Sequence, residues 1–390
     1  MLPHTVTVRL RKDLSRALSE GHPWVYREAL EAFSAAPGSV ATVLDAKGRF
    51  VARGLVDEGP IGVRVFTLHD EQLGPSLFAA RVTRAVELRR RFWPDDTNAL
   101  RLVHGEGDRL PGFVCDLYDQ HAVLKVDGAG AAAWAETFAE SLWPALEALS
   151  VRHLVLRRGR AETKQITALR GALPEGPLTV REHAMRLGAD LVNGQKTGLF
   201  LDQRSARRRV RAMAQGLRVL NLYGYTGGFS IAAGLGGASQ VTTVDVAPGA
   251  VALANAGWRD NGLDPAQHEG VVDDVPRFLA ARGGARWELV IADPPSFAPS
   301  EAAVESALRA YRTLHTSCIS KVAPGGYYLA GSCSSHITHP MLLDTLREGA
   351  AKARRVLQVV DHWGAPEDHP HLAAFTEGAY LKNVLCRIAE

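Results

Sequence analysis

Two polar positions at the ends of apolar segments are the best candidates for chemistry in this sequence. The apolar residues 287–292 end abruptly in Asp293, which is followed by two prolines that stiffen the turn. Residues 325–332 lead in the same way to Cys333, a thiol between serines. A carboxylate in such a turn can accept a hydrogen bond from an exocyclic amino group, and an exposed thiol can act as a nucleophile. Each has a structural alternative, a simple turn for Asp293 and a small core residue for Cys333.

A glycine-rich loop indicates a nucleotide-containing ligand. Residues 218–246 predict a strand, a turn with Gly224, Gly227 and Gly228, a short helix and a second strand that ends at Asp245. Glycine lets a ligand approach the backbone, a helix N-terminus offers amide donors, and a carboxylate at the second strand end can accept ribose hydroxyls. The spacing lacks the GxGxxG fingerprint of NAD sites and suits S-adenosylmethionine, whose amino-acid tail fits against the loop. An ordinary strand-to-helix turn is the alternative.

Other polar segments could complete this site. Residues 193–204, NGQKTGLFLDQR, could close over the methionine tail of a cofactor, or could simply start a helix. Asp273 and Asp274 follow the third strand and could accept a hydrogen bond from adenine, although an aspartate near a helix start is usually a cap. His369 and His371 lack further ligands at metal spacing, so we expect no metal site.

The elements that must position these residues alternate along the chain. From residue 180 onward, strands alternate with helical patterns, which predicts an α/β domain with a parallel sheet covered on both faces. The pattern fits an open, doubly wound sheet with an antiparallel edge strand, and in such sheets ligands bind at the carboxyl ends of the strands. The seven expected strands lie near Val219, Val241, Val271, Leu289, Tyr327, Val356 and Val384.

Two further parts precede this sheet. Residues 1–73 combine short alternating apolar segments with glycine-containing turns, which indicates a small, mainly β module. Residues 74–178 combine helices and strands in a separate α+β domain, and residues 171–180 have the proline and glycine content of a linker. The expected division is therefore 1–73, 74–178 and 179–390.

Composition limits the class of protein. The chain has 390 residues, a formal net charge of +3 and four cysteines without CxxC or Cys/His spacing, so we expect neither a disulfide framework nor a zinc site. Three cysteines, Cys115, Cys318 and Cys386, fall among apolar neighbours and are expected in the core. No apolar run is long enough to cross a membrane and the N-terminus lacks the apolar block of a signal peptide, which predicts a cytoplasmic protein.

Clustered arginines indicate contact with nucleic acid, although solvated helix faces are the commoner meaning of any single cluster. The clusters are Arg9, Arg11, Lys12 and Arg16; residues 89–91; and Arg204, Arg207, Arg208, Arg209 and Arg211.

Several segments together resemble one family. NGQKTGLFLDQR, NLYGYTGGFS, DPPSF, SCS and DHPHLAAFTEGAYLK occur in an order similar to that of the bacterial large-subunit ribosomal RNA cytosine-C5 methyltransferases of the RlmI type. EGHPWVYREAL resembles the PUA domain of that family and GEGDRLPGFVCDLY its central domain, so the resemblance spans nearly the whole chain. It implies a Rossmann-like class I methyltransferase sheet, a PUA-like N-terminal domain, S-adenosylmethionine as cofactor, and RNA, in particular large-subunit ribosomal RNA, as partner.

The resemblance also implies roles for individual residues. Cys333 would be the nucleophile that adds to C6 of cytosine, Asp293 would contact the target base, and Asp245 would hold the ribose of the cofactor. The cofactor pocket would be lined by Lys196, Thr197, Gln203, Asn221, Tyr223, Thr226, Gly227, Asp245, Asp293 and an acidic residue at Asp273 or Asp274. Substrate contacts would come from Pro294, Pro295, Phe297 and Arg204. No residue in the sequence identifies the base that removes the C5 proton.

Two other functions fit part of the pattern. An RNA amino-group methyltransferase acting on guanine N2 or adenine N6 could use the Asp293 turn to orient an exocyclic amine, and it would not need Cys333. A non-catalytic RNA-binding assembly factor could keep the fold without binding S-adenosylmethionine. The sequence leaves open the target nucleotide and whether the protein is a homodimer.

Overall fold

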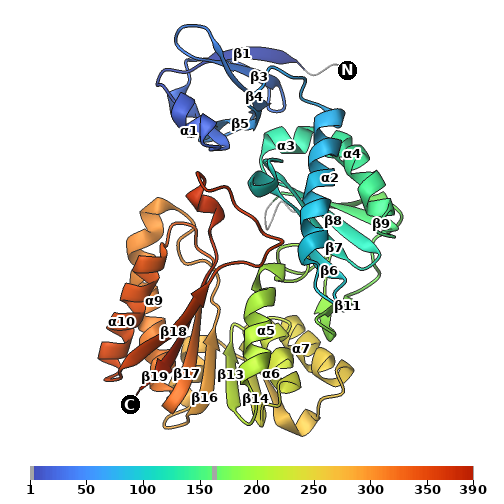
Figure 1. The fold of residues 1–390 in the computed structure, drawn as a ribbon. Helices are drawn as coiled ribbons and strands as arrows, with labels where there is room; N and C mark the ends of the chain where they lie inside the picture. The colour runs from blue at the N-terminus through green and yellow to red at the C-terminus, as the bar shows by residue number, and fades with distance from the viewer. Residues whose placement is uncertain (1–3, 160–164, 390) are drawn as a thin grey trace. The chain divides into compact units, whose positions relative to one another are not determined.

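The computed structural model describes residues 4–159 and 165–389, which form two compact units (Figure 1). Unit 1 comprises Met1–Leu178, Asp190–Leu201 and Glu367–Gly378, and unit 2 comprises Thr179–Ala189, Asp202–Pro366 and Ala379–Glu390. The chain therefore passes between the units several times. The expected three domains divide the chain more finely, since unit 1 contains both N-terminal parts, and their boundaries remain a prediction.

The first sheet of unit 1 is a small, mainly antiparallel module. Its strands are β1 (Thr5–Arg9), β2 (Trp24–Tyr26), β3 (Val40–Leu44), β4 (Phe50–Val56) and β5 (Ile61–Thr67), in the order β1-β3-β4-β5-β2. Only the β1–β3 pair is parallel. Ala41 and Val43 alternate along β3 and pack in the same core as Leu18 of helix α1 (Ser15–Ser19), as a half-buried strand requires.

The second sheet of unit 1 is covered by helices α2 (Pro75–Phe92), α3 (Ala129–Ala133) and α4 (Ala135–Glu147). Phe78 of α2, Phe113 of the sheet and Phe138 of α4 lie in one core, and the rings of Phe113 and Phe138 stack at 4.1 Å. The strands are β6 (Ala99–His104), β7 (Phe113–Tyr118), β8 (His121–Val126), β9 (His153–Arg158) and β10 (Gln165–Arg170), in the order β10-β9-β8-β7-β6.

A short hairpin leads into unit 2. Its strands are β11 (Leu178–Glu182) and β12 (Met185–Ala189), joined by His183 and Ala184, which both have positive φ (48° and 64°). Such a two-residue turn matches the twist of the flanking strands. The expectation of a linker over residues 171–180 was therefore wrong for its last three residues, because they belong to β11.

The main sheet of unit 2 has seven strands in the order β15-β14-β13-β16-β17-β19-β18. This arrangement confirms the predicted α/β fold. The strands are β13 (Arg218–Leu222), β14 (Gln240–Asp245), β15 (His268–Val272), β16 (Trp287–Ala292), β17 (Val322–Ser332), β18 (Leu357–Trp363) and β19 (Lys382–Ile388).

Helices cover both faces of this sheet (Figure 1). Leu289 and Ile291 of β16 share a core with residues of α5, α6 and α7, whereas Val290 and Ala292 share a second core with residues of α8, α9 and α10. This alternation is what a strand buried on both faces must show. The helices are α5 (Arg204–Met213), α6 (Gly228–Leu235), α7 (Pro248–Asp260), α8 (Val275–Ala281), α9 (Val304–Ser320) and α10 (His339–Lys352).

The antiparallel strand is not at the edge of the sheet, contrary to the expectation from the sequence. It is β19, which lies between β17 and β18, and the edge strand is β18. The connection from β17 to β18 runs through helix α10 and leaves one strand position open between these two strands. The C-terminal strand β19 fills that position, and because it is antiparallel to β18 it needs no crossover helix. As a result, Lys382 at the start of β19 pairs with Ser332 at the end of β17.

Candidate functional site

A strained loop follows the central strand β13 of unit 2. Tyr223 and Tyr225 have φ of 56° and 45°, and Gly227, just before α6, has φ of 78°. A left-handed conformation costs a residue other than glycine about 1–2 kcal/mol, so two such tyrosines in one turn must be held by other contacts. The backbone N–H of Gly224 donates to the carbonyl of Val244 at 3.0 Å. The loop is thus tied to the neighbouring strand β14.

Asp245, the last residue of β14, fixes the same loop from the other side. Its Oδ2 accepts a hydrogen bond from the backbone N–H of Tyr225 at 2.9 Å, and its Oδ1 accepts one from Ala247 at 2.9 Å. The side chain is only partly buried. Since each carboxylate oxygen can accept more than one hydrogen bond, Asp245 keeps acceptor capacity for a pair of vicinal hydroxyls.

Asp293 follows β16, the strand on the other side of β13. Its Oδ2 accepts a hydrogen bond from Nε2 of Gln203 at 2.9 Å, and Oε1 of Gln203 accepts one from Asn383 at 3.1 Å. A Cβ atom at Gly331 would lie 2.5 Å from Oδ1 of Asp293, closer than such atoms approach in proteins. The Asp293 carboxylate therefore lies against Gly331 near the end of β17, where a side chain would leave no room for it.

Cys333 comes directly after β17, two residues beyond Gly331. It is half-buried, whereas Cys115, Cys318 and Cys386 are buried as expected. Burial raises the pKa of the Cys318 and Cys386 thiols to about 12 and also raises the pKa of Cys115. Cys333 is thus the cysteine best placed to react.

Tyr311 of α9 lies near both candidate groups. Its hydroxyl donates to Oγ of Ser332 at 2.9 Å, and Oγ of Ser334 lies 2.9 Å from Oγ of Ser296 in the Asp293 turn. Burial raises the pKa of Tyr311, and the charges of Cys333 and Asp293 raise it further, so both groups lie within electrostatic range of its hydroxyl. The structure thus brings Asp293 and Cys333 to one edge of the sheet, around Tyr311.

Comparison with known proteins decides the family of this chain. Residues 134–387 match the family described as S-adenosylmethionine-dependent methyltransferase, and residues 8–68 match a PUA-like domain. Ribosomal RNA large subunit methyltransferase I of Yersinia pseudotuberculosis serotype O:1b is 33% identical over 98% of this chain and 100% of its own length. The protein of the same name from Serratia proteamaculans has the same identity and coverage. The chain belongs to the ribosomal RNA large subunit methyltransferase I family.

A solved structure has the same fold as this family member. The crystal structure of SMU.776 complexed with SAH superimposes with a TM-score of 0.87, at 22% sequence identity, over 98% of this chain and 100% of that one. At this identity the likeness concerns the fold alone. The family match itself confirms S-adenosylmethionine as the predicted cofactor and confirms the predicted PUA-like module.

The residues around the strained loop fit the methyl donor of this family. Asn221 is fully buried below the loop, and its Nδ2 donates to Oγ of Ser230 at 2.9 Å. Its Oδ1 has no hydrogen-bond partner within the part of the chain that the structure describes. An unsatisfied buried acceptor costs about 1–3 kcal/mol, which a ligand that brings a donor to this loop would offset. The amino group of a methionine tail is such a donor.

The two aspartates after β15 differ in their local roles. Asp274 is the N-cap of α8 and accepts a hydrogen bond from the backbone N–H of Arg277 at 3.2 Å. Asp273 forms an exposed ion pair with the Arg277 side chain, and its backbone N–H donates to the carbonyl of Asp245 at 3.1 Å. Asp274 is thus a helix cap, which was the structural alternative expected for these aspartates. Asp273 is hydrogen-bonded through its backbone to Asp245 at the end of β14.

The polar segment 193–204 is divided between the units. Lys196 and Thr197 belong to unit 1, where Nζ of Lys196 lies 4.6 Å from the ring centroid of Phe200 and the hydroxyl of Thr197 donates to Asp116 at 2.6 Å. Gln203 belongs to unit 2 and contacts Asp293. The cofactor roles expected for Lys196 and Thr197 remain predictions.

The expected substrate contacts differ in exposure. Pro295 is exposed, and Phe297 is half-buried with its ring centroid 4.9 Å from that of Tyr311. Pro294 is buried, and Arg204 is only 2% exposed. Pro295 and Phe297 are therefore the better candidates to meet a base.

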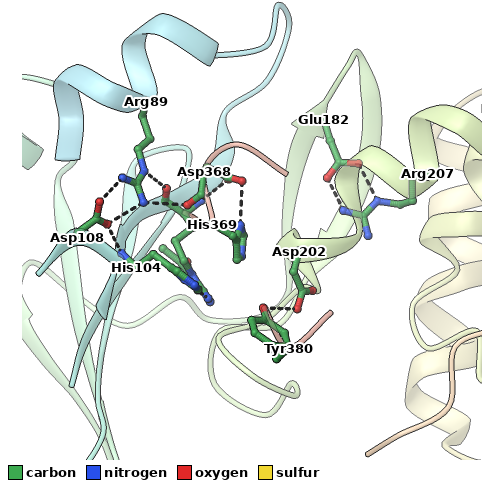
Figure 2. Close-up of polar contacts among 11 residues, drawn as sticks. Arg89, His104, Asp108, Glu182, Asp202, Arg207, Asp368, His369 and Tyr380 are labelled. Carbon is green, nitrogen blue, oxygen red and sulfur yellow. Dashed lines mark hydrogen bonds and ion pairs between the residues drawn. The ribbon is translucent and has the colours of Figure 1, made fainter. Parts of the chain in front are cut away.

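Some clustered arginines serve the fold rather than a surface for phosphates. Arg207 of α5 forms a buried ion pair with Glu182 of β11 (Figure 2). Arg89 of α2 is buried in unit 1 against Asp108, at 2.6 and 2.8 Å. The nucleic-acid hypothesis was wrong for these two side chains, because a buried, paired guanidinium cannot contact a phosphate. Arg90, Arg91 and Arg208 are exposed.

The DHPHL segment is anchored inside unit 1 and is not a free loop. Figure 2 shows Arg89 between Asp108 and the carbonyl of Asp368, which it reaches at 2.8 Å. Oδ1 of Asp368 also lies 2.8 Å from Nδ1 of His369, a residue that is 4% exposed. Over the described ranges, the structure contains no group of three His, Cys, Asp or Glu side chains suited to a metal, and no helix of the length and apolar character that a bilayer crossing needs.

Two residues of the site were not found by sequence reasoning, Tyr311 and Lys382. Lys382 is 8% exposed, and its Nζ donates to the carbonyl of Ser334 at 2.5 Å. In the sequence, Tyr311 fits the pattern of an apolar position on a helix, and nothing in the segment GAYLK assigns a role to Lys382. The antiparallel pairing of β19 with β17, which brings Lys382 to Cys333, has no signal in the local sequence.

Proposed function

We propose that this protein methylates C5 of a cytosine in large-subunit ribosomal RNA through a covalent bond from Cys333. The names of the relatives support ribosomal RNA as the substrate. The observation that carries the C5 reaction is the half-exposed Cys333 at the end of β17, with Asp293 against Gly331 on the same strand. A thiol is not required for methyl transfer to an amino group, whereas carbon C5 needs activation.

The cofactor would be held at the carboxyl ends of β13, β14 and β15. Asp245 would accept the ribose hydroxyls, the loop of Tyr223, Thr226 and Gly227 would border the methionine tail, and Asn221 would accept from its amino group. Asp273 would take the adenine side, because Asp274 already caps α8. Gln203 would orient Asp293 toward the space between cofactor and base. S-adenosylmethionine supplies an electrophilic methyl group on a positively charged sulfur.

The protein side of the reaction follows from the chemistry of cytosine. The Cys333 thiolate would add to C6, and the electron pair displaced from the C5=C6 bond would make C5 nucleophilic enough to take the methyl group. The bond between that methyl group and the sulfur of the donor would break at the same time, which leaves S-adenosylhomocysteine. Asp293 would favour this adduct by accepting a hydrogen bond from the amino group of the base, or from N3 once N3 carries a proton in the adduct. When a base removes the proton from C5, the C5=C6 double bond forms again, the C6–S bond breaks, and the thiolate is released. The reacting cytosine must leave its stack to reach such a site, as in a single-stranded or looped region.

A methyl-transfer assay tests this function. Unmodified ribosomal RNA is incubated with labelled S-adenosylmethionine, and the product is mapped by bisulfite sequencing or mass spectrometry. We expect 5-methylcytosine with the wild type and no product with Cys333→Ala. Ser335→Ala, which changes an exposed side chain two residues away, should keep the activity. Full activity of Cys333→Ala would contradict the mechanism.

The same assay separates the main alternative. Asp293, followed by two prolines and Phe297, could also orient an exocyclic amine of guanine or adenine. In that case the mapped product would be a methylated amino group, and Cys333→Ala would retain the activity. An assembly factor without catalysis would give no methylated product with any variant and no measurable binding of S-adenosylmethionine.

A further inference from the structure

Lys382 is a buried cation that donates to a backbone carbonyl. It is 8% exposed, and its Nζ donates one hydrogen bond, to the carbonyl oxygen of Ser334 at 2.5 Å. Among residues 4–159 and 165–389, no carboxylate lies within ion-pair distance of it. Burying an ammonium group without a counter-charge is costly, so such groups are normally paired. Lys321 is buried to a similar extent and also donates to a backbone carbonyl, so what distinguishes Lys382 is its place in the fold.

The strand register places this lysine beside Cys333. Lys382 is the Cα partner of Ser332 in the β17–β19 pair, and its Nζ reaches the carbonyl of Ser334. Ser332 and Ser334 flank Cys333, so the lysine side chain runs along the loop that carries the thiol. Two of the three N–H donors of an ammonium group remain for other acceptors.

We propose that Lys382 is a positioning residue whose ammonium group holds Cys333 as a thiolate before RNA binds. The inference rests on the proposed function, since it assigns a role to the nucleophile of that reaction. A cation within about 4–6 Å favours the charged form of a thiol and lowers its pKa by about 1–3 units. In return, the thiolate supplies the counter-charge that buried Lys382 otherwise lacks.

The electrostatics of the neighbourhood agree with this pairing. Burial lowers the pKa of Lys382 to about 8, and the charge of Cys333 acts in the opposite direction, toward the ammonium form. The other titratable groups here are Asp293, Tyr311, His339 and His362. Burial lowers the pKa of His339, and His362 and Lys382 lower it further, which favours a neutral ring. The negative charge of Asp293 disfavours a thiolate at Cys333, and Lys382 is the cation that offsets this effect.

Thiol alkylation measures this effect without any methyl transfer. Full-length wild-type protein, without RNA or cofactor, is treated with iodoacetamide over a range of pH, and modification of the Cys333 peptide is followed by mass spectrometry. Because the thiolate is the reactive form, the midpoint of the rate profile reports its ionisation. We expect a midpoint clearly below the ordinary thiol value of about 8.5. A wild-type midpoint at or above that value would overturn the proposal without any variant.

Two substitutions at the lysine separate charge from packing. Lys382→Met keeps the length and removes the charge, so the midpoint should rise by about one unit or more and alkylation near neutral pH should slow by about tenfold. Lys382→Arg keeps the charge and should keep the low midpoint. An unchanged midpoint in Lys382→Met, or an equal rise in Lys382→Arg, would show that the charge is not the cause.

Lys321 provides a matched control. It is 7% exposed, and its Nζ also donates to a backbone carbonyl, that of Gly283, at 2.6 Å. Lys321→Met should leave the Cys333 midpoint unchanged, and an equal shift would refute a local effect of Lys382. The outcome is independent of the methylation assay: if Cys333→Ala retained activity while the alkylation profiles followed the expectation, the proposed function would fail and the thiolate pairing would stand.

Discussion

At the scale of single residues, the proposed site depends on Gly331 as well as on Asp293 and Cys333. Gly331 allows the Asp293 carboxylate to lie against β17, and a Cβ atom there would be 2.5 Å from Oδ1 and 3.2 Å from Cγ of Asp293. Since Asp293 is also held by Gln203 at 2.9 Å, the displaced carboxylate would lose both its place and its partner.

Gly331→Ala should therefore impair methyl transfer more than folding. A shift of the carboxylate by about 1 Å can cost up to about 100-fold in rate, so we expect a fall of about 10- to 100-fold in kcat/KM. Gly249→Ala in α7 is the control, because no atom lies within 4 Å of the added Cβ there and alanine favours a helix. Equal activity of the two variants would mean that the position of Asp293 does not matter.

The sequence predicted part of this arrangement. Asp293 and Cys333 each follow an apolar strand, and ends of neighbouring parallel strands meet at one edge, so their proximity could be expected. Lys382 could not be assigned in this way, because its approach to Cys333 depends on β19 lying beside β17. Tyr311 could not be assigned either, since its hydroxyl finds Ser332 only once α9 is packed on the sheet.

At the scale of elements, the loop proposed to border the cofactor is held in a strained conformation by the next strand. The left-handed Tyr225 donates its backbone N–H to Asp245, and Gly224 donates to the carbonyl of Val244. Loop and strand thus form one structural element, although 20 residues separate Tyr225 from Asp245. Asp245 therefore stabilises the loop, in addition to the ribose contact that we propose for it.

Asp245→Ala should weaken cofactor binding through both effects. Hydrogen bonds to a charged group contribute about 1.5–3 kcal/mol, which corresponds to a loss of about 10- to 100-fold in affinity for S-adenosylhomocysteine by calorimetry. Asp264→Ala removes a similar carboxylate, which accepts from the backbone N–H of Ala266 at 2.9 Å outside the cofactor loop. That variant should bind normally, and an equal loss in both would attribute the effect to general destabilisation.

The order of the elements was predictable only as far as it follows the chain. The alternation of strands and helices predicts the doubly wound sheet. The place of β19 depends instead on the connection through α10, which leaves one strand position open between β17 and β18. The same limit applied to the linker prediction, because residues 178–180 belong to β11, which forms a two-stranded sheet with β12.

At the scale of the whole molecule, the division into units reflects tertiary contacts that sequence patterns do not reveal. Glu367–Gly378 joins unit 1 because Asp368 receives Arg89 and the backbone N–H of Arg101, the latter at 2.9 Å. Each unit also buries histidines. Burial lowers the pKa of His104 well below its usual value in unit 1, and lowers the pKa of His315 to about 3 in unit 2.

Buried histidines make the stability of the protein depend on pH in a defined direction. His315 is neutral in the folded state, and its Nδ1 lies 2.8 Å from the Tyr328 hydroxyl, whereas an unfolded histidine takes up a proton near pH 6.5. Between that pH and about 3, the unfolded state binds one proton more, so the free energy of unfolding falls as the pH falls, by about 1.4 kcal/mol per unit.

His315→Gln should reduce this dependence. In urea denaturation at pH 7 and pH 5, the wild type should lose about 2 kcal/mol more than His315→Gln between the two conditions, because glutamine does not titrate. His336→Gln is the control, since His336 is exposed and should leave the loss unchanged. The comparison uses the difference between two pH values, so a constant loss of stability in His315→Gln does not affect it. If His315→Gln loses as much as the wild type, His315 is protonated in the folded state and its burial does not govern its ionisation.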